Sequence, residues 1–296
     1  LDKYYFGKVD RISPEAPVPI VNIQKEESRL GGASNVANNI VSLGGHSLLC
    51  GVIGHDLFGK EIERISRHKN IDTFLLKTSS PTITKARIIG GKQQIVRVDY
   101  EDKSELNADN KKLFRDTISR ILPEYDILVI SDYGKGLISE DLCRYLIKLA
   151  HKYDKKVIID PKGKNWEKYS GADIVTPNVK ELSDIVGYTV PNTDRAIEKA
   201  AREAITNNHL TALLVTRSDK GMSLIGPIPP IHIPTHSEEV FDVSGAGDTV
   251  VATLGLCLAA GFEISEAMRT ANIAAGIVVK KIGTATLTIE ELVQQK

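Results

Sequence analysis

The residues of this sequence best suited to chemistry lie in the run Asp242-Val243-Ser244-Gly245-Ala246-Gly247-Asp248-Thr249. The apolar stretch from Val250 to Ala260 follows it and reads as a buried helix. The start of a helix presents unpaired backbone N–H groups at the positive end of the helix dipole, and glycine lets a phosphate approach them closely. The run therefore predicts an anion-binding cradle.

A carboxylate in such a cradle would repel the phosphate that the amides attract, unless Asp248 takes a proton from an attacking hydroxyl group. A positioned general base contributes about 10² to 10⁴ in rate, and the surrounding amides would offset charge on a transferring phosphoryl group. The alternative is an ordinary aspartate at a helix N-terminus, which stabilises the helix. The glycine pattern favours the base and leaves the alternative open.

Two further polar groups stand at predicted helix starts. Gly31 and Gly32 precede a helix in which Asn35 offers a donor and an acceptor for sugar hydroxyls, although a plain turn with an early-helix asparagine explains them as well. Asn178 and Glu181 lie three apart on one helix face. Such a pair could orient the waters of magnesium, a hard, oxygen-seeking ion, or could simply begin a helix.

Other well-known ligand motifs are missing from the sequence. No GxxxxGK[ST] and no complete GxGxxG after a strand occurs, which weakens the P-loop and dinucleotide readings. The seven histidines show no HExxH or other metal-ligand spacing. A buried strand from Leu213 to Thr216 instead ends in a turn at 217–221, where nucleotide phosphates could lie.

The elements that must position these residues alternate between helix and strand from Asn110 onward, which is typical of an α/β protein with a mostly parallel sheet flanked by helices. Such sheets bind ligands beyond the carboxyl ends of their strands. The expected elements are a helix over Asn110–Leu122, a strand over Ile127–Ile130, a helix from Ser139 through Tyr153, and strands over Lys156–Ile159 and Ile174–Val175.

The pattern of polar and apolar residues before Asn110 differs from this alternation. The segments Thr84–Ile89 and Gln93–Tyr100 flank Gly90-Gly91 and indicate a β-hairpin. Together with the extended segment Val18–Ile23, they predict a small separate sheet, a lid formed by about 11–24 and 84–100, in a single domain over 1–296. An edge extension of the main sheet is the alternative.

The amino-acid composition limits the classes of partner that the protein could bind. Lysine plus arginine and aspartate plus glutamate number 38 each, so no overall field attracts nucleic acid or an anionic membrane, and a small-molecule partner is expected. The nearly apolar run 250–262 is shorter than the roughly 20 residues of a membrane span. Cys50, Cys143 and Cys257 show no CxxC spacing and are expected to be reduced core thiols in the cytoplasm.

Taken together, these motifs resemble the signatures of the ribokinase-type carbohydrate kinase family over almost the whole chain. The resemblance implies a Rossmann-like ribokinase fold with a small β lid, a need for ATP and Mg²⁺, and Asp248 as the base that activates a sugar hydroxyl. It also implies roles for residues that match the family's motifs: amides to the phosphoryl group from Gly245, Ala246 and Gly247, the metal's water shell on Asn178 and Glu181, the nucleotide between Thr216 and Gly221, and the adenine beside Asn272 and Gly276.

Longer stretches resemble one branch of that family, the D-glycero-β-D-manno-heptose 7-phosphate kinases of lipopolysaccharide core assembly. These stretches are 11–17, 81–85, 131–136, 160–163 and 283–286. By that resemblance, ATP phosphorylates the anomeric hydroxyl of heptose 7-phosphate to give heptose 1,7-bisphosphate. The cations that could meet the existing phosphate are Arg11, Lys85, Arg87, Arg97, Lys135 and Lys162, with Arg87 and Lys135 preferred, and Asp2 and Asp132 could hold sugar hydroxyls.

Several alternatives and partners accompany this reading. A kinase of another sugar or sugar phosphate is the nearest rival, followed by a non-catalytic sugar- or nucleotide-binding regulator and a nucleotide-binding oxidoreductase. The lid's edge strands predict a homodimer. The family's first strand, normally just before Asp2, is expected to be missing upstream of Leu1, and the chain is either the kinase half of a protein with a C-terminal nucleotidyltransferase domain or a stand-alone form.

Overall fold

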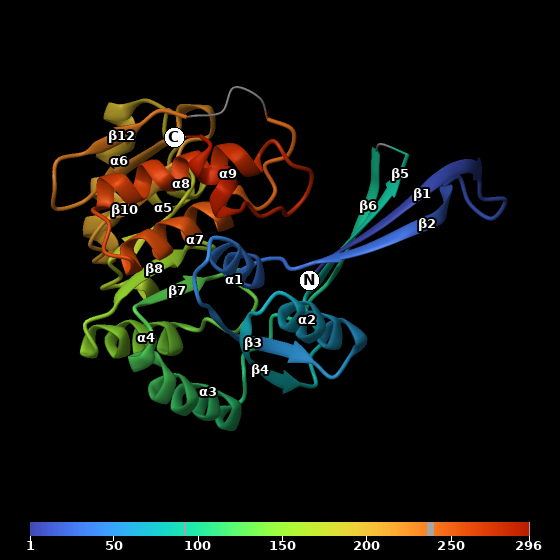
Figure 1. The fold of residues 1–296 in the computed structure, drawn as a ribbon, viewed down its shortest axis with the longest axis horizontal. Coiled ribbons are helices and arrows are strands. Elements are labelled where there is room, and N and C mark those ends of the chain that lie inside the picture. Colours follow the sequence, from blue (N-terminus) through green and yellow to red (C-terminus); the bar gives the residue numbers. More distant parts are fainter. Residues whose placement is uncertain (92, 236–239, 296) are drawn as a thin grey trace.

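The computed structural model describes residues 1–91, 93–235 and 240–295 and contains three β-sheets, of which one projects from a body of helices and strands (Figure 1). The strands are β1 (Asp2–Ile12), β2 (Pro19–Arg29), β3 (Leu48–Gly54), β4 (Asp72–Thr78), β5 (Thr84–Gly90), β6 (Gln93–Tyr100), β7 (Ile127–Ser131), β8 (Lys156–Asp160), β9 (Ile174–Val175), β10 (Leu213–Thr216), β11 (Met222–Ile225) and β12 (Ile231–Ile233). The α-helices are α1 (Ala33–Ser42), α2 (Leu57–His68), α3 (Ala108–Ile121), α4 (Glu140–Lys152), α5 (Val179–Val186), α6 (Asp194–Asn208), α7 (Ala246–Ala259), α8 (Ile264–Val278) and α9 (Ile289–Val293).

The largest sheet forms the centre of the protein, in the order β12-β11-β10-β9-β8-β7. Strands β7 to β10 pair in parallel, whereas β11 and β12 are antiparallel additions. Side chains alternate between the two faces of a strand, and β8 shows this. Val157 and Ile159 pack in a cluster with α3, α4, α5 and α6, while Ile158 packs in a second cluster with α1, α7 and α8. The predicted α/β fold with a mostly parallel sheet flanked by helices is confirmed.

Helix α7 is apolar on all sides because it lies inside this second cluster. Val250, Val251 and Leu254 are almost completely buried there, so α7 is stabilised by core contacts on all of its sides. The helix begins at Ala246, which places Asp248 in its first turn at the edge of the core.

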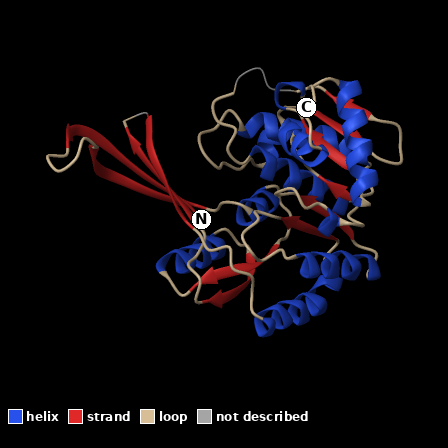
Figure 2. Ribbon diagram, turned by 180° about the vertical axis from the view of Figure 1, so that it is seen from behind, coloured by secondary structure: helices blue, strands red, loops and turns tan. Residues whose placement is uncertain are grey.

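A four-stranded sheet, in the order β2-β1-β5-β6, projects from the body of the protein (Figures 1 and 2). The hairpin expected around Gly90-Gly91 is β5 and β6. The predicted lid ranges, 11–24 and 84–100, are too short in their first part, because β1 starts at Asp2 and β2 continues to Arg29. The alternative of an edge extension of the main sheet is wrong, since none of these strands pairs with that sheet among the described residues.

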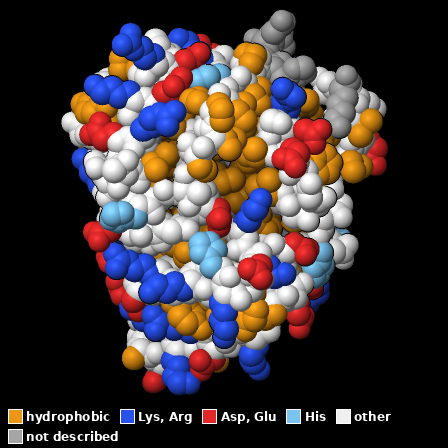
Figure 3. Space-filling model, turned by 90° about the vertical axis from the view of Figure 1, so that its left-hand side faces the viewer, with side chains coloured by type: hydrophobic (Ala, Val, Ile, Leu, Met, Phe, Trp, Pro, Cys, Tyr) orange, Lys and Arg blue, Asp and Glu red, His pale blue; other side chains and the backbone are white. Residues whose placement is uncertain are grey.

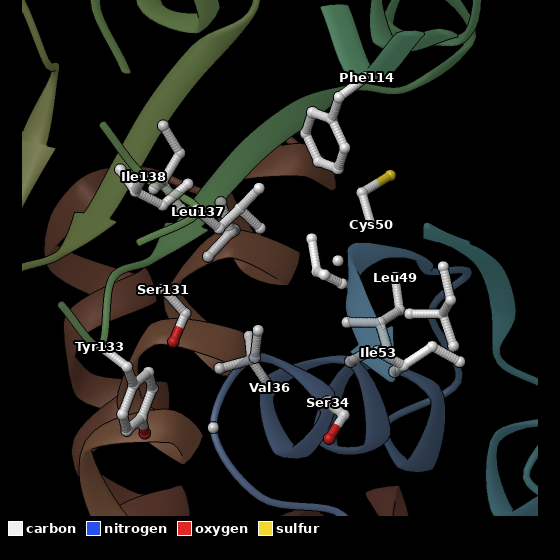
Figure 4. Close-up of a pocket in the computed structure, with 18 of the residues that line it drawn as sticks. Ser34, Val36, Leu49, Cys50, Ile53, Phe114, Ser131, Tyr133, Leu137 and Ile138 are labelled. Carbon is white, nitrogen blue, oxygen red and sulfur yellow. The ribbon is translucent and has the colours of Figure 1, made fainter. Parts of the chain in front are cut away.

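Strands β3 and β4 form a separate parallel pair, which was not predicted from the sequence. A cavity of about 810 Å³ lies between β3 and the main sheet. In Figure 4, Leu49 and Ile53 of the β3 side and Phe114, Leu137 and Ile138 of the other side line it. The lining is mainly apolar, and neither β3 on this side nor β7 has a strand partner across the gap within the described part of the chain. The expectation of one more strand stays a prediction.

The surface carries no single-sign field on the face shown in Figure 3, where Lys and Arg side chains are interspersed with Asp and Glu. Within the ranges that the structure describes, none of the helices combines the length and the apolar character needed to cross a bilayer.

Candidate active site

The site is built around the first turn of α7. Gly245 precedes the helix with φ 79°, and a Cβ there would lie 2.9 Å from the Nδ2 atom of Asn35, so both backbone and space require glycine. The N–H of Ala246 donates to the carbonyl of Val243 at 3.2 Å, which removes one of the three predicted cradle amides. The N–H groups of Gly247 and Asp248 have no backbone acceptor among the described residues and are free for an anion.

The Asp248 carboxylate faces a pocket of about 190 Å³ and is only 6% exposed. Asn35 Nδ2 donates to its Oδ2 at 2.8 Å, and the Tyr133 hydroxyl donates to its Oδ1 at 3.0 Å. Burial raises the pKa of Asp248 to about 6, although these two hydrogen bonds act in the opposite direction. A carboxylate with a pKa of about 6 is ionised at neutral pH and is more basic than an exposed aspartate, as a general base requires.

The amide of Asn35 is oriented by its neighbours. Asn39, one turn further along α1, donates to the Asn35 carbonyl at 2.9 Å and to its side-chain oxygen at 3.4 Å. Thr249 donates to Asn39 Oδ1 at 3.2 Å. This buried chain directs the NH₂ group of Asn35 at Asp248. The role assigned to Asn35 from sequence, binding a sugar hydroxyl, stays a prediction.

The opposite wall of the pocket comes from the carboxyl ends of β8, β9 and β10. It includes Asp160, Thr176, Asn178, Glu181 and Thr216. Burial first, and then the charges of Asp248 and Glu181, raise the pKa of Asp160 to about 8. The sequence analysis quoted Asp160 only as part of a longer motif and assigned it no role, although its place at a strand end was a usable signal.

Asn178 and Glu181 form a capping box at the start of α5. The Asn178 side chain accepts the Glu181 N–H at 2.8 Å, and the Glu181 carboxylate accepts the Asn178 N–H at 3.1 Å. The helix-start interpretation of this pair is therefore present in the structure. Because both residues also line the pocket of Asp248, the capping box fixes them at the place where a metal would be held.

The residues assigned to the nucleotide are spread out. Thr216 lines the pocket, but Gly221, Asn272 and Gly276 are not part of its wall. A Cβ at Gly221 would lie 2.0 Å from the Ile233 carbonyl oxygen, so this glycine serves the close approach of β12. Asn272 donates to the Pro234 carbonyl at 2.7 Å and ties α8 to the segment after β12. Their adenine-side role remains a prediction.

The body-side end of the projecting sheet meets the site. Cross-strand pairing places Asp2, Lys85 and Arg87 on one sheet face, and Arg87 donates to Asp2 Oδ1 at 2.7 Å. A Cβ at Gly31 would lie 2.4 Å from Asp2 Oδ2, so this glycine makes room for the pair. Lys85 Nζ lies 5.2 Å from the centroid of the Tyr133 ring. Tyr133 was quoted from sequence only inside a motif, because its bond to Asp248 spans 115 residues.

The predicted phosphate-binding cations differ in availability. Four are paired: Arg87 with Asp2, Arg97 with Asp99, Lys135 with Glu101, and Lys162 with Glu181. Arg11 is exposed near the outer end of β1, far along the sheet from Asp2 (Figure 1). Lys85 makes no ion pair within the described chain and lies next to the base. The two preferred cations, Arg87 and Lys135, therefore already have partners, and their role in binding phosphate stays a prediction.

Asp132 does not present a free carboxylate. Its Oδ2 accepts hydrogen bonds from Lys168 and, at 2.7 Å, from the Tyr169 hydroxyl, while its Oδ1 accepts the Gly134 N–H at 2.7 Å. The side chain is 3% exposed. In this structure Asp132 anchors the loop after β7, and its predicted role in binding a sugar hydroxyl stays a prediction.

Known proteins resemble the chain in sequence along nearly all of its length. The family model described as "pfkB family carbohydrate kinase" matches residues 4–291. The chain is 46% identical over 294 residues to the protein called Bifunctional protein HldE of Haemophilus influenzae (strain PittEE), covering 99% of this chain and 60% of that protein. It is 44% identical over 293 residues to the D-beta-D-heptose 7-phosphate kinase of Bordetella bronchiseptica, covering 99% and 92%. The chain thus spans about 60% of the length of the bifunctional relatives.

Solved structures show the same fold at low sequence identity. Phosphofructokinase-2 from Escherichia coli in complex with potassium superposes with a TM-score of 0.82 at 21% identity, covering 99% of this chain and 94% of that one. The ribokinase of Arabidopsis thaliana complexed with ribose and ATP gives a TM-score of 0.77 at 20% identity, covering 99% and 95%. A match to the family model over residues 4–291, joined to the glycine-led helix that holds Asp248, places this chain in the pfkB family of carbohydrate kinases.

Proposed function

We propose that this protein transfers the γ-phosphoryl group of ATP to the anomeric hydroxyl of D-glycero-β-D-manno-heptose 7-phosphate, giving the 1,7-bisphosphate in ADP-heptose and lipopolysaccharide core biosynthesis. The observation that carries the proposal is Asp248, a buried carboxylate that faces a pocket beside two unpaired helix amides. The choice of acceptor is supported by the 44% identity to a relative named as a heptose 7-phosphate kinase, of which the chain covers 92%.

The residues of the site divide the work of such a transfer. Asp248 takes the proton of the attacking hydroxyl, whose oxygen bonds to the γ-phosphorus in line with the departing ADP. The N–H groups of Gly247 and Asp248 point at the transferring group from the start of α7, where the helix dipole favours negative charge. Asn35 and Tyr133 hold the base by its two oxygens, so it needs no reorientation before it acts.

The opposite wall suits a divalent cation, which we propose to be Mg²⁺. Asp160 is half-buried and is repelled by Asp248 and Glu181, in line with the rise of its pKa to about 8, and a cation would offset this charge. Asp160, Glu181 and Asn178 would hold the ion through oxygen atoms and water. When bound, it would neutralise charge on the ATP phosphates. We expect Mg²⁺ to raise the melting temperature of the wild type more than that of Asp160→Asn.

Lys85 is the cation that we assign to the phosphate already present on the sugar. It is the member of the predicted set that has no ion-pair partner among the described residues and lies beside the base. Replacing Lys85 with methionine should raise the KM for the sugar phosphate about ten- to a hundredfold, the range expected for a hydrogen bond to a charged group. Lys77→Met, at an exposed lysine paired with Glu63, is the matched control and should leave KM unchanged.

A panel of acceptors tests the proposed substrate. Heptose 7-phosphate, fructose 6-phosphate, ribose and fructose would each be supplied with ATP and Mg²⁺, and ADP release would be measured. The proposal requires turnover of heptose 7-phosphate well above that of phosphate-free sugars. Preferential turnover of another sugar would make the chain a kinase of different specificity, and ATP binding without transfer to any of them would favour a non-catalytic regulator.

We also propose that two copies of the chain associate through the projecting sheet. Val96, Val98 and Tyr100 share one face of β6 and are 44%, 40% and 45% exposed. Apolar side chains gathered in this way on one exposed sheet face typically mark an interface. Light scattering after size exclusion should give a dimer for the wild type and a monomer for Val96→Glu, with Val293→Glu on α9 as an equally charged control. A monomeric wild type would exclude this association.

Two further expectations concern the surroundings of the protein. The relatives named bifunctional are longer than this chain, and a nucleotidyltransferase partner domain is proposed on that ground alone. Within the described residues none of the three cysteines forms a disulfide, and burial raises the pKa of Cys50 and of Cys143 to about 12, which suits core thiols in a reducing cytoplasm.

A further inference from the structure

Tyr133 is the member of the site whose chemistry phosphoryl transfer itself does not require. It lies just after β7, beside α1 and away from the apolar middle of the large cavity (Figure 4). Its hydroxyl donates to Asp248 Oδ1 at 3.0 Å. Burial and the neighbouring Asp248 charge raise the pKa of Tyr133 well above its usual value, so the phenol keeps its proton and acts as the donor in this bond.

The Tyr133 ring also has two close neighbours, Gly32 and Lys85. A Cβ at Gly32 would lie 3.1 Å from ring atom Cε2, and Gly32 has φ 56°, so the absence of a side chain there leaves room for the ring. Lys85 Nζ lies 5.2 Å from the ring centroid, within the range in which a cation is attracted to an aromatic face. One side chain therefore contacts both the base and the cation assigned to the sugar phosphate.

We propose that Tyr133 is a positioning residue with two separable tasks: its hydroxyl fixes the orientation of Asp248, and its ring holds Lys85 beside the base. The inference rests on the proposed function for the roles of these two neighbours. In this arrangement the loop after β7 connects α7 of the core to β5 of the projecting sheet, through Asp248 and Lys85. The ionisation of Asp248 also depends on the groups that face it from other elements. These are Asn35 from α1, Asp2 from β1, Lys85 from β5 and Asp160 at the end of β8.

The two tasks predict different kinetic effects. Tyr133→Phe removes the hydroxyl and keeps the ring, so kcat at pH 7 should fall about ten- to a hundredfold, the range expected for losing a hydrogen bond to a charged group. The KM for the sugar phosphate should stay within about threefold. Because the lost donor stabilised the ionised carboxylate, the acid limb of the pH profile should move up by about one pH unit.

Tyr133→Leu removes the ring as well and should raise KM about five- to tenfold beyond the phenylalanine variant, since Lys85 loses its support. This rise should disappear when Lys85→Met is the common background. Should the leucine variant fail to fold, Lys85→Met against Tyr133→Phe provides the same contrast, with the first acting mainly on KM and the second on kcat.

Tyr188→Phe is the matched control, because the Tyr188 hydroxyl donates to Glu203 at the same 3.0 Å on the protein surface. It should leave kcat, KM and the pH profile unchanged. A Tyr133→Phe variant with unaltered kcat and an unaltered acid limb would overturn the first task. Equal KM values for the phenylalanine and leucine variants would overturn the second.

The test is independent of the identity of the sugar. The ratios between variants are measured with whichever sugar phosphate the wild type phosphorylates, so a different acceptor would refute the proposed substrate and leave the test of Tyr133 intact. The pKa of Asp248, followed by carbon-13 NMR of labelled aspartate, must also rise in Tyr133→Phe without any substrate. An unchanged value would overturn the assignment of the hydroxyl.

Discussion

Replacing Asp248 with asparagine should abolish most activity and at the same time stabilise the protein. Asparagine fits the site, because its carbonyl can accept from Asn35 while its NH₂ group donates to the oxygen of Tyr133. It cannot take a proton from a hydroxyl group. The expected loss is about 10² to 10⁴ in kcat, the usual contribution of a positioned base, whereas ATP should still bind.

The stabilising effect follows from the pKa of Asp248, which burial raises from 3.8 to about 6. At 1.36 kcal/mol for each pK unit, ionising this group in the folded protein costs about 3 kcal/mol at neutral pH. The folded state holds its proton between pH 3.8 and about pH 6 while the unfolded chain has lost it, so stability falls as the pH rises through this window. Asparagine avoids that cost, and the gain should be present above pH 6 and absent below pH 3.8.

Urea unfolding at pH 8 and at pH 3.5 measures this difference, together with ADP release at pH 8. Asp56→Asn is the control of opposite sign, because hydrogen bonds from Thr82 and Gly59 lower the pKa of Asp56, and asparagine there should destabilise the fold without affecting transfer. Turnover by Asp248→Asn within tenfold of the wild type would refute the base. A variant less stable than the wild type at pH 8 would refute the electrostatic argument.

Three other predictions follow from the same geometry. Gly247→Ala should fold normally and lose phosphoryl transfer, because a Cβ there meets nothing within 4 Å and would occupy the space left for the phosphoryl group. Gly245→Ala should instead lower the melting temperature, since Gly245 has φ 79° and a Cβ there would lie 2.9 Å from Asn35. Equal melting temperatures of the two variants would contradict this. The acid limb of kcat/KM should lie near pH 6, where Asp248 is protonated, and a profile flat down to pH 5 would contradict that assignment. A chain with an apolar segment ahead of Leu1 that can fill the gap between β3 and β7 should have a free energy of unfolding in urea that is higher by several kcal/mol. Each large apolar side chain buried contributes about 1.5 to 3 kcal/mol, from which the entropy cost of ordering the segment is subtracted. An unchanged free energy of unfolding would exclude a strand there.

The parts of the fold that could be predicted from sequence are those with local signals. Strand β8 alternates between buried faces over Val157, Ile158 and Ile159, and its ends agree with the prediction within one residue. Strand β1 carries no comparable signal, because its outer part, residues 8–12, is exposed and its pairing with β5 joins residues more than 80 positions apart. The projecting sheet was therefore predicted from its hairpin and from the extended segment Val18–Ile23, most of which lies in β2, and its first strand was missed.

The candidate site shows the same division. Glycines before an apolar helix gave the place of Asp248, because a helix N-terminus is a local feature. The choice among the cations depends on which of them already has a partner. Lys135 looks as suitable as Lys85 in the sequence, and only the folded chain shows that Glu101 occupies it. Tyr133 was missed as a partner of the base for the same reason.

The position of Asp248, the proposed base, in the first turn of α7 resolves a conflict between basicity and stability. A carboxylate needs burial to become basic, yet burial of its charge destabilises the fold, by about 3 kcal/mol for Asp248 on the pKa given above. The start of a helix reduces this cost, because the dipole and the N–H groups of the first turn favour negative charge. The rest of α7 offsets the remainder, since Val250, Val251 and Leu254 are almost fully buried in the core. A base on a surface loop would lack both the raised pKa and this support, so the apolar helix that follows Asp248 is part of what makes the carboxylate usable as a base.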